Sequence, residues 1–292
     1  MSDLSGKKIV VDISIYLYKF VAENALLENM YLMLATFRYY GIIPVFIFDG
    51  KPPTEKKELL ENRRQDKRDA ENEFNRLREN LELDMEETER QEIQTSMDQL
   101  KKQFICIRRN QIQSVKDLIM AFGATYYDAP GEADELCAYL VNKKKVWGCL
   151  SEDTDMFVYG CANVLRYLSL MNHTVVLYKT KEILDELGLT QKEFREICVL
   201  SGTDYNVTKE SGNLYSVLKV FKKYHKASTT DFYSWLRENE YDYDYETLRE
   251  INEMFEVSSE DFGDFEKKKI SNGIYQKEQI RGILKEDGFI FV

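Results

Sequence analysis

Short apolar runs alternate with longer amphipathic segments through the first half of the chain. The segments between the runs have helical spacing of their apolar positions, as in residues 15–40 and in a helix expected from about Glu132 to Lys144. Residues 163–180 read as a hairpin that turns around Met171 and Asn172. Continuous β-branched runs are typical of buried parallel strands, and here they are KKIVVDIS (7–14), GIIPVFIFDG (41–50), GATYYDAP (123–130) and VWGCLSED (146–153). The pattern predicts an α/β fold with a doubly wound parallel sheet, in which ligands bind at the carboxyl ends of the strands.

Residues 54–105 break this pattern. They contain neither Pro nor Gly, and their apolar residues are sparse. The segment therefore predicts two long polar helices with a break near residues 80–88. Sustained heptads are absent, so a helical insertion that stands off the domain fits better than a coiled coil.

The chain becomes helical again from Thr190. The string QKEFREICVLSGTDYN places Asp204 just after a helix with an apolar face. A turn at Gly212 and Asn213 then leads into an amphipathic helix that carries Lys219, Lys222, Lys223 and Lys226. A glycine turn followed by a basic helix can hold a duplex phosphate backbone through the N–H groups at the start of the helix, although this signal alone is weak.

Bulk composition excludes several classes of protein. With 292 residues, 43% hydrophobic and 31% charged, the chain can bury an ample core in one large domain or two small ones. It has no apolar run of 18 residues, and MSDLSGKK lacks the apolar core of a signal peptide, so we expect an intracellular protein without a membrane partner. The five cysteines form no CxxC pair, and His173 and His225 lie far apart outside the acidic motifs. Zinc and histidine-based catalysis are therefore disfavoured.

Net charge conceals an uneven distribution. The formal charge is −11, but residues 231–266 alone hold 13 Asp and Glu against two Arg, so the rest of the chain is neutral overall. Basic residues cluster in 51–68, in 101–116 and around Lys219–Lys226. Local patches, and not the net charge, decide where a phosphate backbone can lie. The alternative interpretation of each patch is an ordinary helix face exposed to solvent.

Acidic residues occur where the predicted strands or helices end. Two of the five strings carry acid-x-acid pairs, one in APGEADE and one in CLSEDTD. Unpaired carboxylates gathered this closely would repel one another, and hard cations such as Mg²⁺ prefer oxygen ligands. A helix N-cap role is the alternative for Asp134 or Asp155 taken singly. Together the acids predict a divalent metal pocket formed by Asp12, Asp49, Glu132, Asp134, Asp153, Asp155 and Asp204.

The ordered strings DISIYLYKF, VFIFDGKPP, APGEADE, SEDTD and LSGTDY resemble the flap endonuclease branch of the XPG/Rad2-like structure-specific 5′ nucleases. The resemblance covers roughly residues 6–285 and is specific as a set. It implies a PIN-like α/β fold in a single nuclease domain, residues 1–292. The implied parts are an α/β core (6–50 and 120–205), a helical arch (51–119), and a helix–two-turn–helix element with a C-terminal helical region (190–292).

The resemblance also implies roles for individual residues. Two Mg²⁺ ions, replaceable by Mn²⁺, would be held by Asp12, Asp49, Glu132 and Asp134 and by Asp153, Asp155 and Asp204, with Asp134 able to bridge. Lys56 and Arg63 would act on the scissile phosphate, and Tyr18 would stack on the base beside it. The alternatives are a solvated basic face for the two cations and a core aromatic for Tyr18. Duplex contacts are expected from Gly212, Lys219, Lys222 and Lys223.

The implied reaction is hydrolysis of phosphodiesters in a 5′ single-stranded flap where it meets duplex DNA, together with 5′–3′ exonuclease activity. The expected partner is branched or flapped DNA, bound by a monomer in the nucleus or at another site of DNA replication, repair or recombination, including a viral one. The alternatives are a PIN-like ribonuclease acting on RNA and a non-catalytic junction-binding scaffold. The seven carboxylates argue against a scaffold, which has no need of them.

Several features depart from the family pattern. The glycine-started N-terminal segment is missing, and the short connection from Asp12 to Asp49 leaves little room for a 3′-flap pocket. The second glycine of the duplex-binding turn is lost at 212–214, and no C-terminal motif supports tethering to a sliding clamp. The acidic, tyrosine-rich stretch 238–246 is expected to be a solvated loop.

Overall fold

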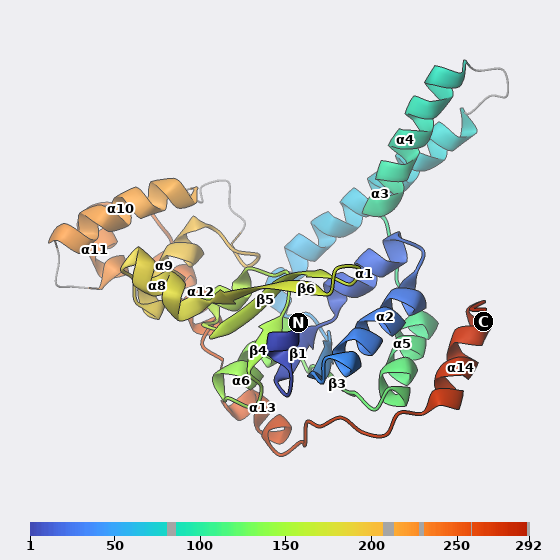
Figure 1. The fold of residues 1–292 in the computed structure, drawn as a ribbon. Coiled ribbons are helices and arrows are strands. Elements are labelled where there is room, and N and C mark those ends of the chain that lie inside the picture. The colour runs from blue at the N-terminus through green and yellow to red at the C-terminus, as the bar shows by residue number, and fades with distance from the viewer. Residues whose placement is uncertain (81–85, 207–212, 228–230, 258, 291–292) are drawn as a thin grey trace.

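A six-stranded sheet forms the centre of the molecule (Figure 1). The computed structural model describes residues 1–80, 86–206, 213–227, 231–257 and 259–290. The strand order is β3-β2-β1-β4-β5-β6, with the first five strands parallel and β6 antiparallel to β5. The strands are β1 Lys8–Asp12, β2 Ile43–Phe48, β3 Thr125–Asp128, β4 Gly148–Leu150, β5 Asn163–Ser169 and β6 Thr174–Lys179. The predicted parallel sheet and the predicted hairpin are both confirmed.

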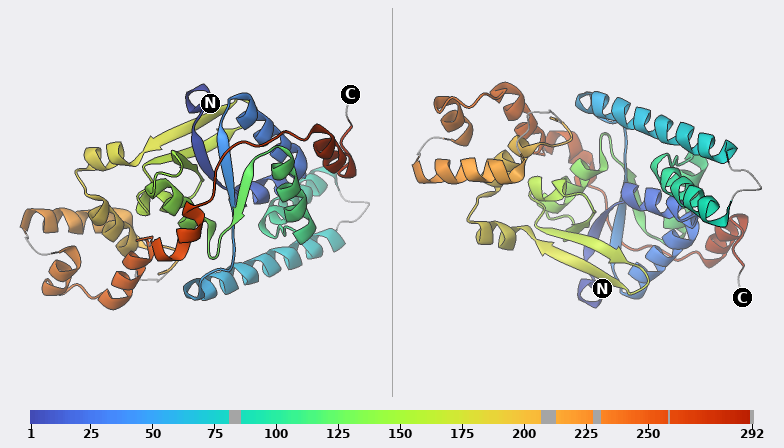
Figure 2. Two further views of the ribbon diagram at one scale, coloured as in Figure 1. Left: turned by 90° about the horizontal axis from the view of Figure 1, so that it is seen from below. Right: turned by 90° about the horizontal axis from the view of Figure 1, so that it is seen from above.

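Helices cover both faces of the sheet (Figure 2). Successive strand residues point to opposite faces, so Ile9 and Val11 join one buried cluster while Val10 joins the other. The first cluster includes side chains of α1 Ser14–Ala22, α2 Leu26–Tyr39, α5 Arg109–Ala121 and α14 Lys277–Glu286. The second includes side chains of α6 Ala133–Asn142 and α7 Asp155–Val158. Burial on both faces explains why the strands read as continuous apolar runs.

A helical lobe lies beside the β5–β6 end of the sheet (Figure 1). The predicted basic helix is α10, and its Phe221 packs on Phe232 with ring centroids 5.0 Å apart. The lobe comprises α8 Thr180–Leu187, α9 Gln191–Ser201, α10 Leu214–Ala227, α11 Phe232–Glu238 and α12 Tyr245–Met254. The next helix, α13 Ser259–Glu266, packs on α6 in the body. No helix in the described parts of the chain combines the length and the apolar character needed to span a membrane.

Two long helices, α3 Lys57–Glu79 and α4 Glu87–Gln103, stand away from the body of the molecule (Figure 1). We refer to them as the projecting hairpin. They pack on each other, with Phe74 against Phe104 at 5.4 Å between ring centroids. A short 3₁₀ turn, Thr54–Lys56, leads into α3. The range predicted for an arch, 51–119, also overlaps α5, which is amphipathic and packs on α2 and β3 in the body.

The chain returns to the sheet through residues 267–276, which we call the C-terminal strap. The Gly273 N–H donates to the Gly123 carbonyl at 2.6 Å, and the Gln276 N–H donates to the Ala121 carbonyl at 2.8 Å. Gly123 has φ of +75°, and a Cβ there would lie 2.6 Å from Gly273. Glycine at this position therefore permits the close approach of two backbones. The strap is followed by α14, which packs on α5.

Candidate active site

The acidic residues predicted from the sequence come to the carboxyl edge of the sheet. Asp12 ends β1, and Asp49 directly follows β2. Glu132 is the N-cap of α6, and Asp134 lies in the first turn of that helix, where the helix dipole favours negative charge. The remaining three follow β4 or α9, and they are Asp153, Asp155 and Asp204.

Three of these carboxylates lie close enough to share one metal ion. Asp134, Asp153 and Asp155 each offer an oxygen, and these atoms all lie within 4.8 Å of one another. Asp134 is buried, with 8% of its surface exposed. Oxygen-only ligands suit hard divalent cations, and three gathered carboxylates repel one another unless a cation lies among them. The residues present therefore fit a divalent metal ion.

Serine hydroxyls and backbone amides hold the two strand-end carboxylates. Ser151 donates its hydroxyl to Asp12 Oδ2 at 2.9 Å and accepts the N–H of Asp153 at 3.1 Å. Ser14 donates its hydroxyl to Asp49, whose other oxygen accepts the N–H of Ala133 at 2.9 Å. Ser151 is fully buried, so it links the β1 and β4 acids from beneath the site.

Two cations from the base of the projecting hairpin meet the remaining carboxylates. The Lys56 Nζ lies 2.7 Å from Glu132 Oε2 and 3.8 Å from Asp204 Oδ2, and Arg63 contacts the same Asp204 oxygen at 3.0 Å. Only 6% of the Lys56 surface is exposed, so it is not part of a solvated helix face. Lys56 and Arg63 therefore both contact Asp204, from the base of the projecting hairpin.

Family models match both halves of this site. The XPG N-terminal domain matches residues 1–70, and the XPG I-region matches residues 123–204. Together they span more than half of the chain and contain all seven acids, Lys56 and Arg63. The chain belongs to the XPG/Rad2 family.

Relatives in this family agree in sequence and in fold. Flap endonuclease 1 of Trypanosoma brucei gambiense is 32% identical over 222 residues, which cover 68% of this chain and 54% of that protein. The chain thus spans about half the length of the curated relatives it matches. The catalytic core of Rad2 in complex with DNA superposes with a TM-score of 0.69 at 21% identity, covering 98% of this chain and 89% of that one. Flap endonuclease-1 from Methanococcus jannaschii gives a TM-score of 0.63 at 22% identity, covering 98% and 88%.

Burial raises the pKa of three acids of this XPG-family site. Burial, reinforced by the charge of Asp153, raises the pKa of Asp155 to about 7. Burial and then Asp49 raise the pKa of Asp12 to about 6. The pKa of Asp134 lies well above its usual value, again through burial and then through Glu132. Burial alone lowers the pKa of Lys56, but the hydrogen bond and charge of Glu132 outweigh it and leave the pKa raised.

These shifts predict how the stability of the metal-free protein depends on pH. Between pH 5 and 7.5 the folded state binds more protons than the unfolded state, because the pKa values of Asp12 and Asp155 exceed the ordinary 3.8. The free energy of unfolding should therefore fall as pH rises through this window. Thermal melts in EDTA at pH 5.0, 6.0 and 7.5 measure it, and Mg²⁺ should restore stability at pH 7.5. Asp155→Asn should flatten the slope, whereas a steeper loss in that variant would contradict the assignment.

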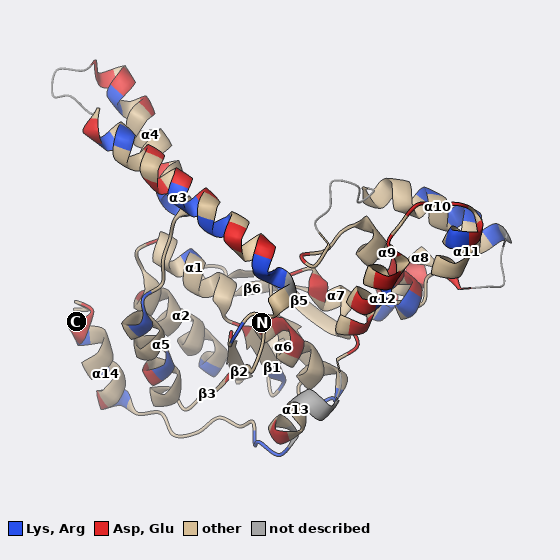
Figure 3. Ribbon diagram, turned by 180° about the vertical axis from the view of Figure 1, so that it is seen from behind, with Lys and Arg blue, Asp and Glu red and all other residues tan. Residues whose placement is uncertain are grey.

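The residues expected to touch DNA lie on two separate elements. Tyr18 on α1 is 44% exposed, and Lys67 of α3 lies 5.1 Å from the centroid of its ring. Lys219, Lys222 and Lys223 are exposed on α10, where Figure 3 shows a run of basic positions. Gly212 lies outside the described residues. Tyr18 is therefore accessible beside the projecting hairpin, and the lysines form a basic surface on the helical lobe.

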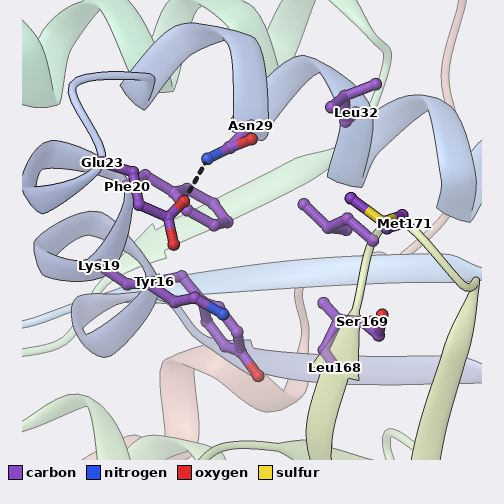
Figure 4. A pocket seen from close by; sticks show the side chains of 10 residues that line it. Tyr16, Lys19, Phe20, Glu23, Asn29, Leu32, Leu168, Ser169 and Met171 are labelled. Carbon is purple, nitrogen blue, oxygen red and sulfur yellow. Dashed lines mark hydrogen bonds between the residues drawn. The ribbon is translucent and has the colours of Figure 1, made fainter.

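A hollow of about 570 Å³ lies beside the site, between α1, α2 and the tip of the β5–β6 hairpin (Figure 4). Its lining is mixed, with Phe20, Leu32 and Met171 beside the charged Lys19. Glu23 at its rim accepts a hydrogen bond from Asn29 at 2.7 Å. The Tyr16 hydroxyl donates to Glu152 Oε1 at 3.5 Å, so Tyr16 connects the hollow to the loop that also carries Asp153.

Sequence reasoning missed the hydroxyls that hold the carboxylates. They are Ser14, Ser151 and Tyr205, whose hydroxyl donates to Glu132 Oε2 at 3.0 Å. The available signal is their position, since each lies within two residues of one of the acids. Position along the chain did not identify the acid that each hydroxyl binds. Tyr205, for example, lies next to Asp204 but donates to Glu132, which is 73 residues away.

Gly50 packs against the loop 129–131, which leads into Glu132 and α6. A Cβ at Gly50 would lie 1.9 Å from the Ala129 carbonyl oxygen, and the Gly50 N–H donates to the Gly131 carbonyl at 2.7 Å. Gly50→Ala should therefore destabilise the fold by about 2–3 kcal/mol, measured by urea unfolding. Gly282→Ala in α14 is the control, since a Cβ at this position meets nothing within 4 Å. This substitution should raise the free energy of unfolding by up to about 1 kcal/mol. Equal effects of the two substitutions would show that the close approach is not constraining.

Proposed function

We propose that this chain is a metal-dependent, structure-specific 5′ nuclease that cuts 5′ flaps where single-stranded DNA meets duplex, with 5′–3′ exonuclease activity as well. The observation that carries the proposal is the meeting of Lys56 and Arg63 with the acidic pocket at the foot of the projecting hairpin. A metal site alone would suit many hydrolases. Inward-facing cations beside it suit a phosphodiester, whose charge the carboxylates would otherwise repel.

We propose Mg²⁺ as the metal, with two ions per site and Mn²⁺ able to replace it. Bound ions would supply a water of lowered pKa and would stabilise charge on the phosphate and leaving oxygen. Asp134, Asp153 and Asp155 lie close enough together to hold one ion, and Asp134 would bridge to the second. The proposed sets are Asp12, Asp49, Glu132 and Asp134 for one ion and Asp153, Asp155 and Asp204 for the other.

The chain itself would bind and orient the scissile phosphate. Lys56 and Arg63 would exchange part of their contact with Glu132 and Asp204 for the phosphate oxygens. The two carboxylates and an anionic substrate compete for the same donors. Tyr18 presents a half-exposed ring on which the adjacent base can stack. Strand selection would then rest on shape and backbone contacts, without reading base edges.

The whole chain would act as a single nuclease domain. In this proposal the flap passes the projecting hairpin, which serves as the arch, while the α10 lysines and the turn at Gly212 hold the duplex. The protein would work as a monomer at sites of DNA replication, repair or recombination in the nucleus or at a viral replication site. The Rad2 core that this fold resembles is in complex with a DNA substrate, which supports DNA as the partner, and the cleavage comparison below tests DNA against RNA.

The decisive experiment compares a labelled 5′-flap duplex with a matched duplex whose 5′ end is blocked by a bulky group, both in Mg²⁺. Cutting near the junction only with a free 5′ end is the expected result and supports threading past the projecting hairpin. Equal cutting of both would reject the threading role. Cutting of an all-RNA flap alone would replace DNA by RNA, and binding without cutting of any substrate would indicate a scaffold.

A further inference from the structure

Tyr205 joins two charged groups that belong to different parts of the molecule. Its hydroxyl donates to Glu132 Oε2 at 3.0 Å, and the same oxygen lies 2.7 Å from Lys56 Nζ. The Lys56 Nζ also lies 4.5 Å from the centroid of the Tyr205 ring, within the range of a cation–π contact. The three side chains therefore form a closed triangle, in which each member touches the other two.

The loop that carries Tyr205 is itself well held. Asn206 accepts the Thr203 N–H at 2.7 Å and donates its own amide to the Val199 carbonyl at 2.7 Å. The Tyr205 ring packs edge-on against Phe255, with centroids 5.7 Å apart, and Phe255 is 1% exposed. Tyr205 is thus anchored to the end of α9 and to the core of the helical lobe. A contact that it makes with Lys56 positions the foot of the projecting hairpin relative to that lobe.

The triangle also orients Glu132. Both donors converge on Oε2, and we expect the other carboxylate oxygen, Oε1, to face the metal ion. The ring, in turn, gives the buried Lys56 ammonium a second favourable neighbour besides its carboxylates. The hydroxyl and the ring of one side chain therefore act on two different partners, and substitutions can separate their effects.

We infer that Tyr205 is a positioning residue of the nuclease site: its hydroxyl orients Glu132 toward the metal ion, and its ring holds the Lys56 ammonium where the scissile phosphate binds. This inference rests on the proposed function and deepens it. The contacts of Tyr205 within the site are with Glu132 and Lys56, so we expect it to act through these two residues. Loss of Tyr205 should accordingly affect metal affinity and turnover while leaving DNA affinity unchanged.

Two substitutions test the two halves separately. Tyr205→Phe keeps the ring and removes the hydroxyl, and we expect Mg²⁺ affinity measured by calorimetry to weaken about tenfold. Tyr205→Leu also removes the ring, and we expect the single-turnover cleavage rate at saturating Mg²⁺ to fall about 100-fold. In both variants the Kd for flap DNA, measured in Ca²⁺, should stay within about twofold of the wild type. Tyr233→Phe is the matched control, since it removes a buried, hydrogen-bonded hydroxyl of the same lobe that faces no site residue.

A double-mutant cycle with Lys56→Met distinguishes positioning from a general structural role. If Tyr205 acts through Lys56, then Tyr205→Leu should cost little further rate in the Lys56→Met background. A full additional loss in that background would overturn the ring's role, and unchanged Mg²⁺ affinity in Tyr205→Phe would overturn the hydroxyl's. Absence of cleavage by the wild type on every substrate would instead reject the proposed function, while the Mg²⁺ titration would still test the hydroxyl. Thermal melts confirm that each variant is folded.

Discussion

Asp155→Asn should reduce cleavage of a 5′-flap duplex by about 10²–10³-fold while the protein still binds the substrate. Asp155 shares a metal-sized cluster with Asp134 and Asp153, and the substitution removes a full negative charge without changing the size of the side chain. Affinity for a divalent ion depends directly on that charge. Binding should persist, because the phosphates of the duplex arms meet basic residues elsewhere.

The measurement is a single-turnover rate in Mg²⁺ beside a binding isotherm in Ca²⁺. Asp185→Asn is the matched control, because Asp185 is an exposed carboxylate on α8 that is not one of the seven acids of the site. A variant of Asp155 that retains more than about a tenth of the wild-type rate would refute its assignment as a metal ligand. A folded protein is expected, since removing a buried charge that is difficult to ionise should not destabilise the metal-free state.

Lys56→Ala and Arg63→Ala should each lower the turnover number by about 10²–10³-fold with little change in DNA affinity. Both cations face the acidic pocket, so their charge is placed where negative charge develops on the phosphate. Lys56 should be the more sensitive of the two, because it is buried and contacts two carboxylates, whereas more than half of the Arg63 side chain is exposed.

Lys57→Ala provides the control for this pair. Lys57 is the next residue, carries the same charge and is exposed, so its loss should leave the rate within about twofold of the wild type. If Lys56→Ala and Lys57→Ala weaken DNA binding equally and neither lowers the turnover number, the assignment of Lys56 to the chemical step is wrong. The base of α3 would then contact the phosphate backbone only. Measuring the salt dependence of Kd for both variants distinguishes these outcomes.

The sheet and the carboxylate positions were predictable because they depend on local pattern. β-branched runs mark buried parallel strands, and parallel strands bring their carboxyl ends to one edge, so Asp12, Asp49 and Asp153 had to lie near one another. The polar helices of the projecting hairpin were predictable for the same reason, since their apolar positions are too sparse for a deep core. The inward reach of Lys56 followed only from the family resemblance.

Contacts between distant loops were not predictable. Ser151 and Tyr205 lie next to acids in sequence, but the carboxylates they bind come from other elements, 139 and 73 residues away. The stretch 238–246 was expected to be a solvated loop, yet Tyr241 and Tyr243 stack with ring centroids 6.5 Å apart and pack on the core of the lobe. Alternation of tyrosine and acid places the rings on one side and the charges on the other. That alternation is visible in the sequence.

The split of charge within the helical lobe gives the protein an electrical polarity. α10 carries basic residues and no acids, whereas residues 231–266, which follow it, hold 13 acids against two arginines (Figure 3). In the proposed function, the field of the DNA polyanion would attract α10 and repel the acidic segment, and would so favour approach by the α10 side. Productive orientation during diffusion would then come from repulsion of the wrong side as much as from attraction of the right one. An overall acidic protein can in this way find DNA quickly and still release it.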